Sequence, residues 1–496
     1  MTSAGTGRHL PSGSHAESES RQTETTHRTN MASPPTLSKT SPILIVGAGV
    51  FGLSTALHLA ERGYTAVTVL DAQAHDASQY DPQRGSAGAS ADASKIVRVG
   101  YGPQSIYQAL ALEALAGWRA WNAEAGAADS LFVDCGELAF SDDAALSAFE
   151  AASVRGVEAA GYPGALLVVG DATDEAAAAR KGVSAKMDPF RRRERGKDVS
   201  GVLDTLGGLA RADKACRFAL GRARAAGVRF VFGDREGAVQ ALVRDGTGRV
   251  LGVRTRDGTT HAATTTVLAA GAWTPTLLPA LDGLCEATAG SVATLRIPAG
   301  SPLWARLAPE AFPAWAWNMR HGAAGGLYGL PRDGEGVLKI GYRGTKYTNP
   351  VRQADGRERS VPLEAGGEGP KRDRIPKQAL EVIRAFLDEY LPELREEGIL
   401  VESTRFCWYT DSFDNHLVID WVPGHDGLMV ATGGSGHAFK YLPVIGSRVA
   451  DVMERVGLDR PELRAWRWRK PKDGETPVNV LMEGSSGLRA LGNVEV

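Results

Sequence analysis

The chain has 496 residues and a formal net charge of −2, from 56 lysines and arginines against 58 aspartates and glutamates. This balance excludes a nucleic-acid-binding protein that depends on neutralising phosphates, since such a protein carries a basic excess. A hydrophobic content of 43% is ordinary for a globular chain with a large core, while the 59 glycines exceed the usual share of about 7%.

Residues 1–40 are polar, with few apolar side chains, which predicts a disordered leader. This segment lacks the apolar core of a secretory signal, and the last three residues are not the peroxisomal signal Ser-Lys-Leu. We therefore expect a cytoplasmic protein. Residues 471–496 are predicted to form a C-terminal tail.

Order is predicted to begin with a βαβ unit: a strand at 43–46, a helix at 53–62 and a strand at 66–70. The run Ile43–Ala60 contains no charged residue, but it includes three glycines and several polar side chains, and no second such run follows. We expect no membrane span.

Further along the chain, helical spacing predicts helices at 212–226 and 377–391. A β-meander is predicted between them, with turns at Asp245-Gly246 and Asp257-Gly258. The remaining elements predicted in this region are strands at 228–232 and 265–270 and two charged, solvent-exposed segments at 191–197 and 355–373.

The four cysteines are widely separated and form no C-x-x-C pair. This pattern fits neither a disulfide framework nor a zinc site, and it is typical of a reducing compartment. The cysteines are Cys135, Cys216, Cys285 and Cys407.

A glycine-rich turn joins the first predicted strand to the first helix, in the pattern G-x-G-x-x-G, and an acidic residue ends the next strand. Glycine allows the tight turn and the close approach of a pyrophosphate, the helix N-terminus attracts phosphate, and the acid accepts ribose hydroxyls. The pattern predicts dinucleotide binding without choosing between NAD and FAD. The residues expected to contact the dinucleotide are Gly47, Gly49, Val50, Phe51, Gly52 and Asp71.

Five segments in order along 42–456 resemble the FAD-dependent amine oxidases that include fructosyl-amino-acid oxidases (amadoriases), saccharopine and pipecolate oxidases and monomeric sarcosine oxidases. The resemblance implies a glutathione-reductase-like FAD-binding Rossmann domain interleaved with an antiparallel-sheet catalytic domain. The matching segments are Ile43–Asp71, Ser90–Tyr101, Val267–Trp273, Tyr328–Tyr342 and Phe406–Gly446.

The resemblance implies that FAD is covalently bound through Cys407, because the family's cysteine in this segment bonds to the flavin. A thiolate nucleophile needs access and a lowered pKa, and Arg405 lies two residues away. From residue type alone, a buried structural cysteine is the alternative. Lys339 matches a family lysine that assists reduction of dioxygen; otherwise its ammonium points outward from a strand.

Arg98 and Lys440 match the family's pair of cations that bind the substrate carboxylate. Each alone is equally consistent with a surface cation. Lys95 matches the lysine of the fructosyl-amino-acid branch, and Arg343 replaces a histidine of sarcosine oxidases, which leaves the substrate preference open.

The remaining matches can also be explained by structure alone: the tyrosines as core aromatic residues, the histidine as a hydrogen-bonded residue and the glycines as a tight turn. Tyr328 and Tyr409 are implied to lie near the substrate, and His437 is a further candidate. The remaining implied cofactor contacts are Ser94, Lys95, Gly271, Gly434, Gly436 and Lys440.

We therefore expect an α/β flavoprotein that oxidises the C–N bond of a secondary amine or N-substituted amino acid and reduces dioxygen to hydrogen peroxide. Its expected partners are a small amine and dioxygen, with no nucleic acid, membrane or metal, and the family precedent is a monomer. The FAD domain is expected to comprise 41–132, 201–285 and 411–470, and the catalytic domain 133–200 and 286–410.

Two alternatives remain open from sequence. The first is a flavin dehydrogenase of the same fold that uses an acceptor other than oxygen. The second is a non-catalytic or NAD-binding Rossmann module. Within the first reading, the substrate also remains open among fructosyl amino acids, saccharopine, pipecolate, sarcosine and an N-methylated secondary metabolite.

Overall fold

The computed structural model describes residues 37–363, 373–472 and 481–496. Nearly all of the predicted leader, and parts of the 355–373 segment and of the C-terminal tail, lie outside the described residues.

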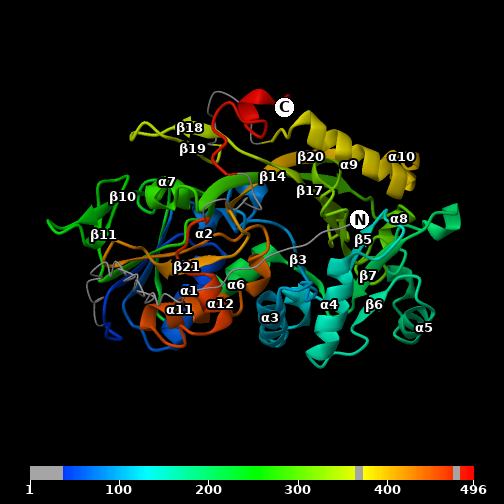
Figure 1. Cartoon of the computed structure of the whole chain (residues 1–496), viewed down its shortest axis with the longest axis horizontal. Helices are drawn as coiled ribbons and strands as arrows, with labels where there is room; N and C mark the ends of the chain where they lie inside the picture. Colours follow the sequence, from blue (N-terminus) through cyan, green and yellow to red (C-terminus); the bar gives the residue numbers. More distant parts are fainter. Residues whose placement is uncertain (1–36, 364–372, 473–480) are drawn as a thin grey trace, which may run out of the picture. The chain divides into compact units, whose positions relative to one another are not determined.

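The predicted βαβ unit lies at the centre of a six-stranded sheet with the order β21-β22-β13-β1-β2-β9 (Figure 1). Every neighbouring pair is parallel except β21 and β22. The strands are β1 (Ile43–Val46), β2 (Val67–Asp71), β9 (Arg229–Phe232), β13 (Thr265–Leu268), β21 (Val418–Trp421) and β22 (Leu428–Thr432).

Strand β1 is apolar throughout because both faces of the sheet are covered. Ile43 and Ile45 pack into one core with the helices, while Leu44 and Val46 pack into a second core on the other face. The helices that contact one another on the first side are α1 (Val50–Glu61), α6 (Ala212–Ala225) and α11 (Ile445–Glu454). The meander on the second side comprises β10 (Val239–Arg244), β11 (Val250–Thr255) and β12 (Thr260–Ala262), as predicted.

An eight-stranded sheet has the order β20-β14-β17-β16-β15-β5-β7-β6, and only β15 and β5 pair in parallel. In Figure 1, helix α9 (Lys377–Tyr390) runs beside β20, β14 and β17, and it buries Ile383 and Phe386 against this sheet. The strands are β5 (Glu137–Ser141), β6 (Leu166–Val168), β7 (Ser200–Asp204), β14 (Cys285–Arg296), β15 (Ala314–Trp317), β16 (Leu327–Leu330), β17 (Val337–Tyr347) and β20 (Val401–Ser412).

The remaining strands and helices lie outside these two sheets. The remaining strands are β3 (Lys95–Val97), β4 (Phe132–Val133), β8 (Gly208–Ala210), β18 (Pro350–Arg352) and β19 (Glu358–Ser360). The remaining α-helices are α2 (His75–Ser78), α3 (Ser105–Ala125), α4 (Ala148–Ala159), α5 (Ala172–Arg180), α7 (Thr274–Leu277), α8 (Leu303–Arg306), α10 (Pro392–Glu396) and α12 (Pro461–Ala465). One parallel sheet with a glycine-rich turn and one largely antiparallel sheet form the α/β architecture that was predicted.

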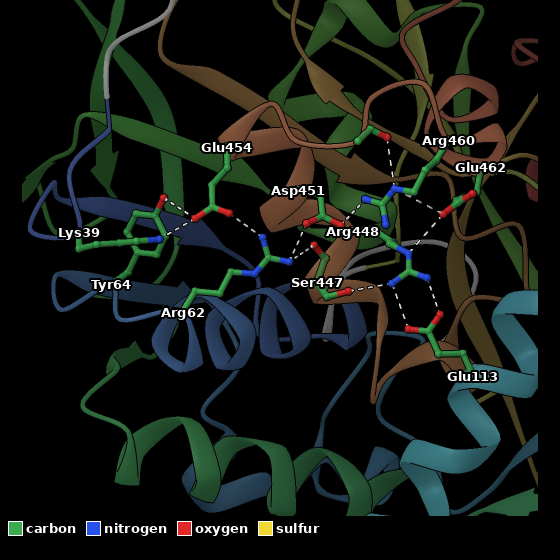
Figure 2. A network of polar contacts seen from close by, with 11 residues as sticks. Lys39, Arg62, Tyr64, Glu113, Ser447, Arg448, Asp451, Glu454, Arg460 and Glu462 are labelled. Carbon is green, nitrogen blue, oxygen red and sulfur yellow. Dashed lines mark hydrogen bonds and ion pairs between the residues drawn. The ribbon is translucent and has the colours of Figure 1, made fainter.

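An ion-pair network joins α1 to α11 (Figure 2). Arg62, which follows α1, lies 2.7 Å from Asp451 and 2.7 Å from Glu454. Glu454 also accepts a bond of 2.7 Å from Lys39, and Arg460 pairs with Asp451. Because α1 carries the glycine-rich turn at its start, this network also fixes the helix that presents the turn.

The segment 191–197 was predicted to be solvent-exposed, and this is wrong for Arg192. Its side chain is 10% exposed and lies 3.0 Å from Glu389, and its guanidinium stacks over the ring of Tyr390 at 4.4 Å. Helix α9, which is distant in sequence, supplies both partners, so the sequence of the segment alone did not reveal the burial.

The described part of 355–373 contains a second buried arginine, so the exposed-loop prediction is wrong there too. Arg359 is 2% exposed and lies 2.7 Å from both Asp282 and Asp355. Two carboxylates compensate the buried charge.

The uncharged run that begins at Ile43 is divided between a strand, a turn and a helix. Across the described ranges, no helix combines the length and apolar character needed to cross a membrane.

Candidate cofactor and active site

A cavity of about 1320 Å³ extends from the glycine-rich turn to the face of the eight-stranded sheet. Pockets for one drug-sized ligand are roughly 300–1,000 Å³, so this cavity has room for a large cofactor and a substrate together. Its wall includes the carboxyl ends of β1, β2, β13 and β22, where ligands of α/β folds bind.

The glycine-rich turn can be built only from glycine at two positions. At Gly47, where φ is +108°, an added Cβ would lie 2.4 Å from the carbonyl oxygen of Ala269. At Gly52, an added Cβ would lie 1.8 Å from the carbonyl oxygen of Gly47. Gly49 precedes α1 without a side-chain cap, and it lines the cavity with Val50 and Phe51. The first N–H of α1, that of Val50, donates to the hydroxyl of Ser90 at 2.9 Å, and the N–H groups that follow it at this helix start fit a diphosphate.

Asp71 ends β2 and lines the cavity. Its two oxygens accept N–H bonds from Ala48 at 2.7 Å and Gln73 at 2.8 Å. Burial alone would raise the pKa of Asp71, but His75 and these donors outweigh burial and hold the pKa below its usual value. A carboxylate has about four acceptor positions, so Asp71 retains capacity for ribose hydroxyls.

At the other end of the cavity, one buried carboxylate binds three cations. Asp92, 2% exposed, lies 2.6 Å from the Nζ of Lys95 and 2.7 Å from the Nη2 of Arg405. Its third partner is Lys339, whose Nζ also donates a bond of 2.7 Å to the carbonyl oxygen of Ser94. One negative charge therefore holds three positive charges, and the cluster has an excess of positive charge.

The three cations shift the pKa of their shared partner. Burial raises the pKa of Asp92, but Lys339, Lys95 and Arg405 together outweigh burial and hold it well below its usual value. Burial lowers the pKa of Lys339 to about 8 against the attraction of Asp92. Lys339 is the most deeply buried of the three cations, so burial disfavours its charged form more than that of Lys95 or Arg405.

Cys407 is 5% exposed, lines the cavity and lies next to this cluster. Its Sγ is 3.8 Å from the Nζ of Lys95. Arg405 lies two residues earlier on the same strand, so both side chains point to one face of the sheet. Lys95 and Arg405 therefore place two positive charges near the sulfur of Cys407.

Arg98 and Lys440 meet at one tyrosine, although they are distant in sequence. The guanidinium of Arg98 stacks over the ring of Tyr101 at 4.4 Å, and the Nζ of Lys440 donates a bond of 2.7 Å to its hydroxyl. Burial and the nearby Arg98 hold the pKa of Lys440 well below its usual value. In the part of the chain that the structure describes, neither cation has a carboxylate within ion-pair distance, and both contact Tyr101. Both line the cavity, so an anionic ligand is the partner that this pair of cations fits.

Each tyrosine of the site packs against a glycine, whose missing side chain leaves room for it. The ring of Tyr328 occupies the place of a side chain at Gly341, and the hydroxyl of Tyr409 lies 3.2 Å from where a Cβ of Gly290 would be. Arg343 donates to the hydroxyl of Tyr409 at 3.3 Å. Both tyrosines and Arg343 line the cavity.

The turn after β22 brings Gly434 and Gly436 to the cavity wall. His437 follows, with its ring 3.4 Å from the hydroxyl of Tyr101 and 3.1 Å from the carbonyl oxygen of Asn415. Burial and Lys440 hold the pKa of His437 well below its usual value, so the ring is neutral. Gly271, with φ of +53°, also lines the cavity.

Three predicted site residues do not line the cavity: Gly52, Ser94 and Lys339. Gly52 acts through packing of the turn, and the carbonyl oxygen of Ser94 holds Lys339. Lys339 lies behind Lys95 and Tyr328, which do face the cavity, with its Nζ 6.0 Å from the centre of the Tyr328 ring.

Sequence reasoning missed Asp92 and Glu137. Asp92 stands three residues before Lys95, a spacing that usually reports an ordinary surface pair. Glu137 begins a strand in a segment where the family resemblance is weak. The sequence did contain one indication for Asp92. It lies in a segment that resembles the family, close to Lys95 and Arg98, and an acid near two cations with implied functions can be buried as their partner.

The sequence pattern of the family described as DAO, FAD dependent oxidoreductase, matches residues 42–452. The chain belongs to this family. L-saccharopine oxidase of Schizosaccharomyces pombe is 30% identical over 441 residues, which cover 86% of this chain and 93% of that protein.

Solved structures agree with membership of the DAO family. Amadoriase II of Aspergillus fumigatus, a fructosamine oxidase solved in complex with FSA, is 28% identical with a TM-score of 0.68, over 88% of this chain and 91% of that one. The fructosyl peptide oxidase of E. terrenum is 25% identical with a TM-score of 0.74, over 93% and 98%. The predicted fold class and the predicted FAD-dependent oxidoreductase are thereby confirmed, and the non-catalytic and NAD-binding alternatives are set aside.

Proposed function

We propose that this FAD-dependent oxidoreductase oxidises the C–N bond of a secondary amine or N-substituted amino acid. The substrate loses two electrons and two protons to become an imine, and water then hydrolyses the imine to a carbonyl compound and an amine. Dioxygen takes up two electrons and two protons to give hydrogen peroxide. When bound, FAD supplies the two-electron acceptor between these half-reactions.

The meeting of Arg98 and Lys440 at Tyr101 carries this proposal. Two cations facing a cavity without an acidic partner among the described residues fit a substrate carboxylate, which they would bind and orient. The neutral His437 adds no further charge, and no acid–base pair is required if the amine binds deprotonated.

Lys339, held by Asp92 and Ser94, supports the choice of dioxygen as acceptor. The excess positive charge of the Asp92 cluster would stabilise negative charge developing on reduced oxygen in a water-poor site. A dehydrogenase that passes electrons to another acceptor has no such requirement.

A peroxide-coupled screen tests the proposal. The panel is fructosyl-valine, fructosyl-lysine, saccharopine, pipecolate, sarcosine and N-methyl-tyrosine. We expect one of these amines to give one peroxide per amine oxidised, and Lys440→Met to raise KM for that substrate more than it lowers kcat. Oxidation without peroxide would favour the dehydrogenase, and no oxidation of any amine would overturn the proposal.

We further propose that FAD is covalently attached through Cys407. The proximity of Lys95 to the sulfur and the position of Cys407 on the cavity wall support this attachment. In denaturing gels, flavin fluorescence should stay with the wild-type chain and be lost from Cys407→Ser. Cys135→Ser is the matched control, because Cys135 is buried but does not line the cavity. Flavin that stays with Cys407→Ser after denaturation would exclude this attachment.

The predicted domain division remains our proposal, with FAD bound by 41–132, 201–285 and 411–470 and substrate by 133–200 and 286–410. The separation of the parallel and antiparallel sheets supports it. We also propose a monomer, which light scattering of the full chain would test.

A further inference from the structure

Glu137, the first residue of β5, is a buried acid whose carboxyl group has no hydrogen-bond or ion-pair partner among the residues that the structure describes. It is 3% exposed and lines the cavity, and its Oε1 has no hydrogen-bond partner. Within the described ranges, its carboxyl group also makes no ion pair. A buried polar group without a partner is costly, so this position is expected to serve a ligand.

The neighbouring acids differ from Glu137 because their partners lie within the protein. Asp204 stands opposite Glu137 on β7, and its oxygens accept N–H bonds from Val99 at 2.7 Å and from Leu206 at 3.0 Å. Glu150 on α4 lies 3.0 Å from Arg320. Both acids line the same cavity, yet each is already satisfied.

The nearest opposite charges to Glu137 belong to the proposed carboxylate clamp. Burial raises the pKa of Glu137 to about 7, and Arg98 and Lys440 oppose this rise while Asp204 adds to it. Arg98 attracts Glu137 but does not form an ion pair with it, so a gap remains between the guanidinium and the carboxyl group. A cation and an anion that face one cavity without touching match a ligand that carries both charges.

We propose that Arg98, Lys440 and Glu137 together bind the zwitterionic head group of an α-amino acid, with its carboxylate at the two cations and its ammonium at Glu137. The inference rests on the proposed oxidase function and narrows its substrate class. A carboxylate stabilises the protonated form of a bound amine, and a protonated amine has no lone pair to assist oxidation. The amine at Glu137 is therefore not the one oxidised, and the reacting secondary amine lies on the substrate side chain.

Binding of a matched ligand pair to the holoenzyme tests this inference without turnover. L-norleucine and hexanoate differ only in the α-ammonium group. A hydrogen-bonded charge contributes about 1.5–3 kcal/mol, so calorimetry should show norleucine binding at least about 10-fold more tightly. Glu137→Gln should abolish this preference while hexanoate still binds. Glu150→Gln, which alters a cavity acid already paired with Arg320, should retain the preference.

The outcomes separate this inference from the proposed function. Equal binding of norleucine and hexanoate to the wild type, or a preference that survives in Glu137→Gln, would overturn the inference even if amines are oxidised. A preference for norleucine with no amine oxidised would leave the head-group site standing and overturn the oxidase proposal.

Matched substrates extend the test to the reaction. Nε-methyl-L-lysine has the full head group, and 6-(methylamino)hexanoate lacks only the α-ammonium group. We expect a kcat/KM at least about 10-fold higher for the first in the wild type, and a ratio near one in Glu137→Gln. If Glu137 instead removed a proton from the reacting amine, the substitution would lower kcat for both substrates equally, and the head-group assignment would be wrong.

Discussion

Lys339 and Asp92, which are 247 residues apart in the chain, form a buried ion pair behind the wall of the cavity. The same carboxylate also binds Lys95, whose Nζ contacts the sulfur of Cys407. The lysine assigned to oxygen and the cysteine assigned to flavin attachment therefore depend on one acidic residue.

Asp92→Asn should destabilise the protein strongly. Removing one partner of a buried ion pair leaves the others uncompensated, which costs about 3–5 kcal/mol, and Asp92 has three cationic partners. Denaturant unfolding of the holoenzyme measures this loss. Asp76→Asn is the control, because Asp76 is 61% exposed where it pairs with Arg224, and a surface pair contributes at most about 1 kcal/mol. Equal losses in the two variants would contradict the role of Asp92.

Lys339→Met should slow reoxidation of the reduced enzyme by dioxygen. Loss of a positioned charge-stabilising group typically costs about 10²- to 10³-fold, and Arg405 and Lys95 retain part of the positive potential, so we expect about 100-fold. Stopped-flow absorbance measures reoxidation separately from anaerobic reduction by substrate, which should change far less. Lys214→Met, which removes a 33% exposed lysine that pairs with Asp129 and does not line the cavity, should leave both steps unchanged. A variant with normal reoxidation would exclude the oxygen role of Lys339.

Gly52→Ala should prevent formation of the cofactor site. The added methyl group would lie 1.8 Å from the carbonyl oxygen of Gly47, which forces α1 away from the turn. Flavin content after purification, read from absorbance, should fall below about one tenth of wild type, since the cofactor must bind at this turn before it can be attached. Gly221→Ala in α6 has open space for its methyl group, and it should stabilise the protein by about 0.5–1 kcal/mol. Full flavin content in Gly52→Ala would disprove this account of the turn.

Glu137→Gln should alter the dependence of stability on pH. The pKa of Glu137 is raised to about 7 in the fold from a usual 4.5, so the folded state binds the proton more tightly than the unfolded state. Wild-type stability is therefore lost as pH rises from about 4.5 to 7. At pH 8 the variant should be the more stable protein by on the order of 2 kcal/mol, and at pH 4 the two should be equal.

Thermal unfolding at both pH values measures that difference. Arg98, Lys440, Asp204 and Glu150 also influence Glu137, and they are unchanged in the variant, so their own titration largely cancels. A variant that is less stable than the wild type at pH 8 would show that Glu137 has a stabilising partner in the folded chain.

Arg359→Ala should destabilise the hairpin of β18 and β19. The side chain of Arg359 is 2% exposed and joins Asp282 to Asp355 at 2.7 Å each, but these carboxylates are 19% and 43% exposed, so water solvates them in part after its loss and the cost is that of hydrogen bonds to charged groups, about 1.5–3 kcal/mol. Arg357 contacts Asp282 too, but its side chain is 70% exposed. Arg357→Ala should therefore change the free energy of unfolding by less than about 1 kcal/mol.

The sequence alone was sufficient to predict those parts of the fold that a short stretch of residues determines. The turn at Gly47 and the helix that begins at Lys377 were both predicted, because glycine geometry and helical spacing are properties of a short window. The meeting of Arg98 and Lys440 was expected only through the resemblance, since no local pattern links two such distant segments.

The sequence was insufficient where burial depends on distant partners. Arg192 and Arg359 lie in charged segments that are typical of exposed loops, yet α9 and Asp282 bury them. Glu137 begins an ordinary strand, and only the folded chain shows that it lines the cavity, opposite Asp204 and near Arg98. Such relationships arise from tertiary structure alone.

Strand β14 pairs with β17 on one side and with β20 on the other, with Thr294 opposite Lys339 and Gly290 opposite Cys407. Strand β14 therefore sets the relative positions of β17 and β20, the strands that carry Lys339 and Cys407. A one-residue insertion or deletion between Gly290 and Thr294 would displace the lysine relative to the cysteine by about 3.3 Å and turn one of them to the other face. Engineering of chain length in this protein is therefore best directed to loops, and β14 should keep its length.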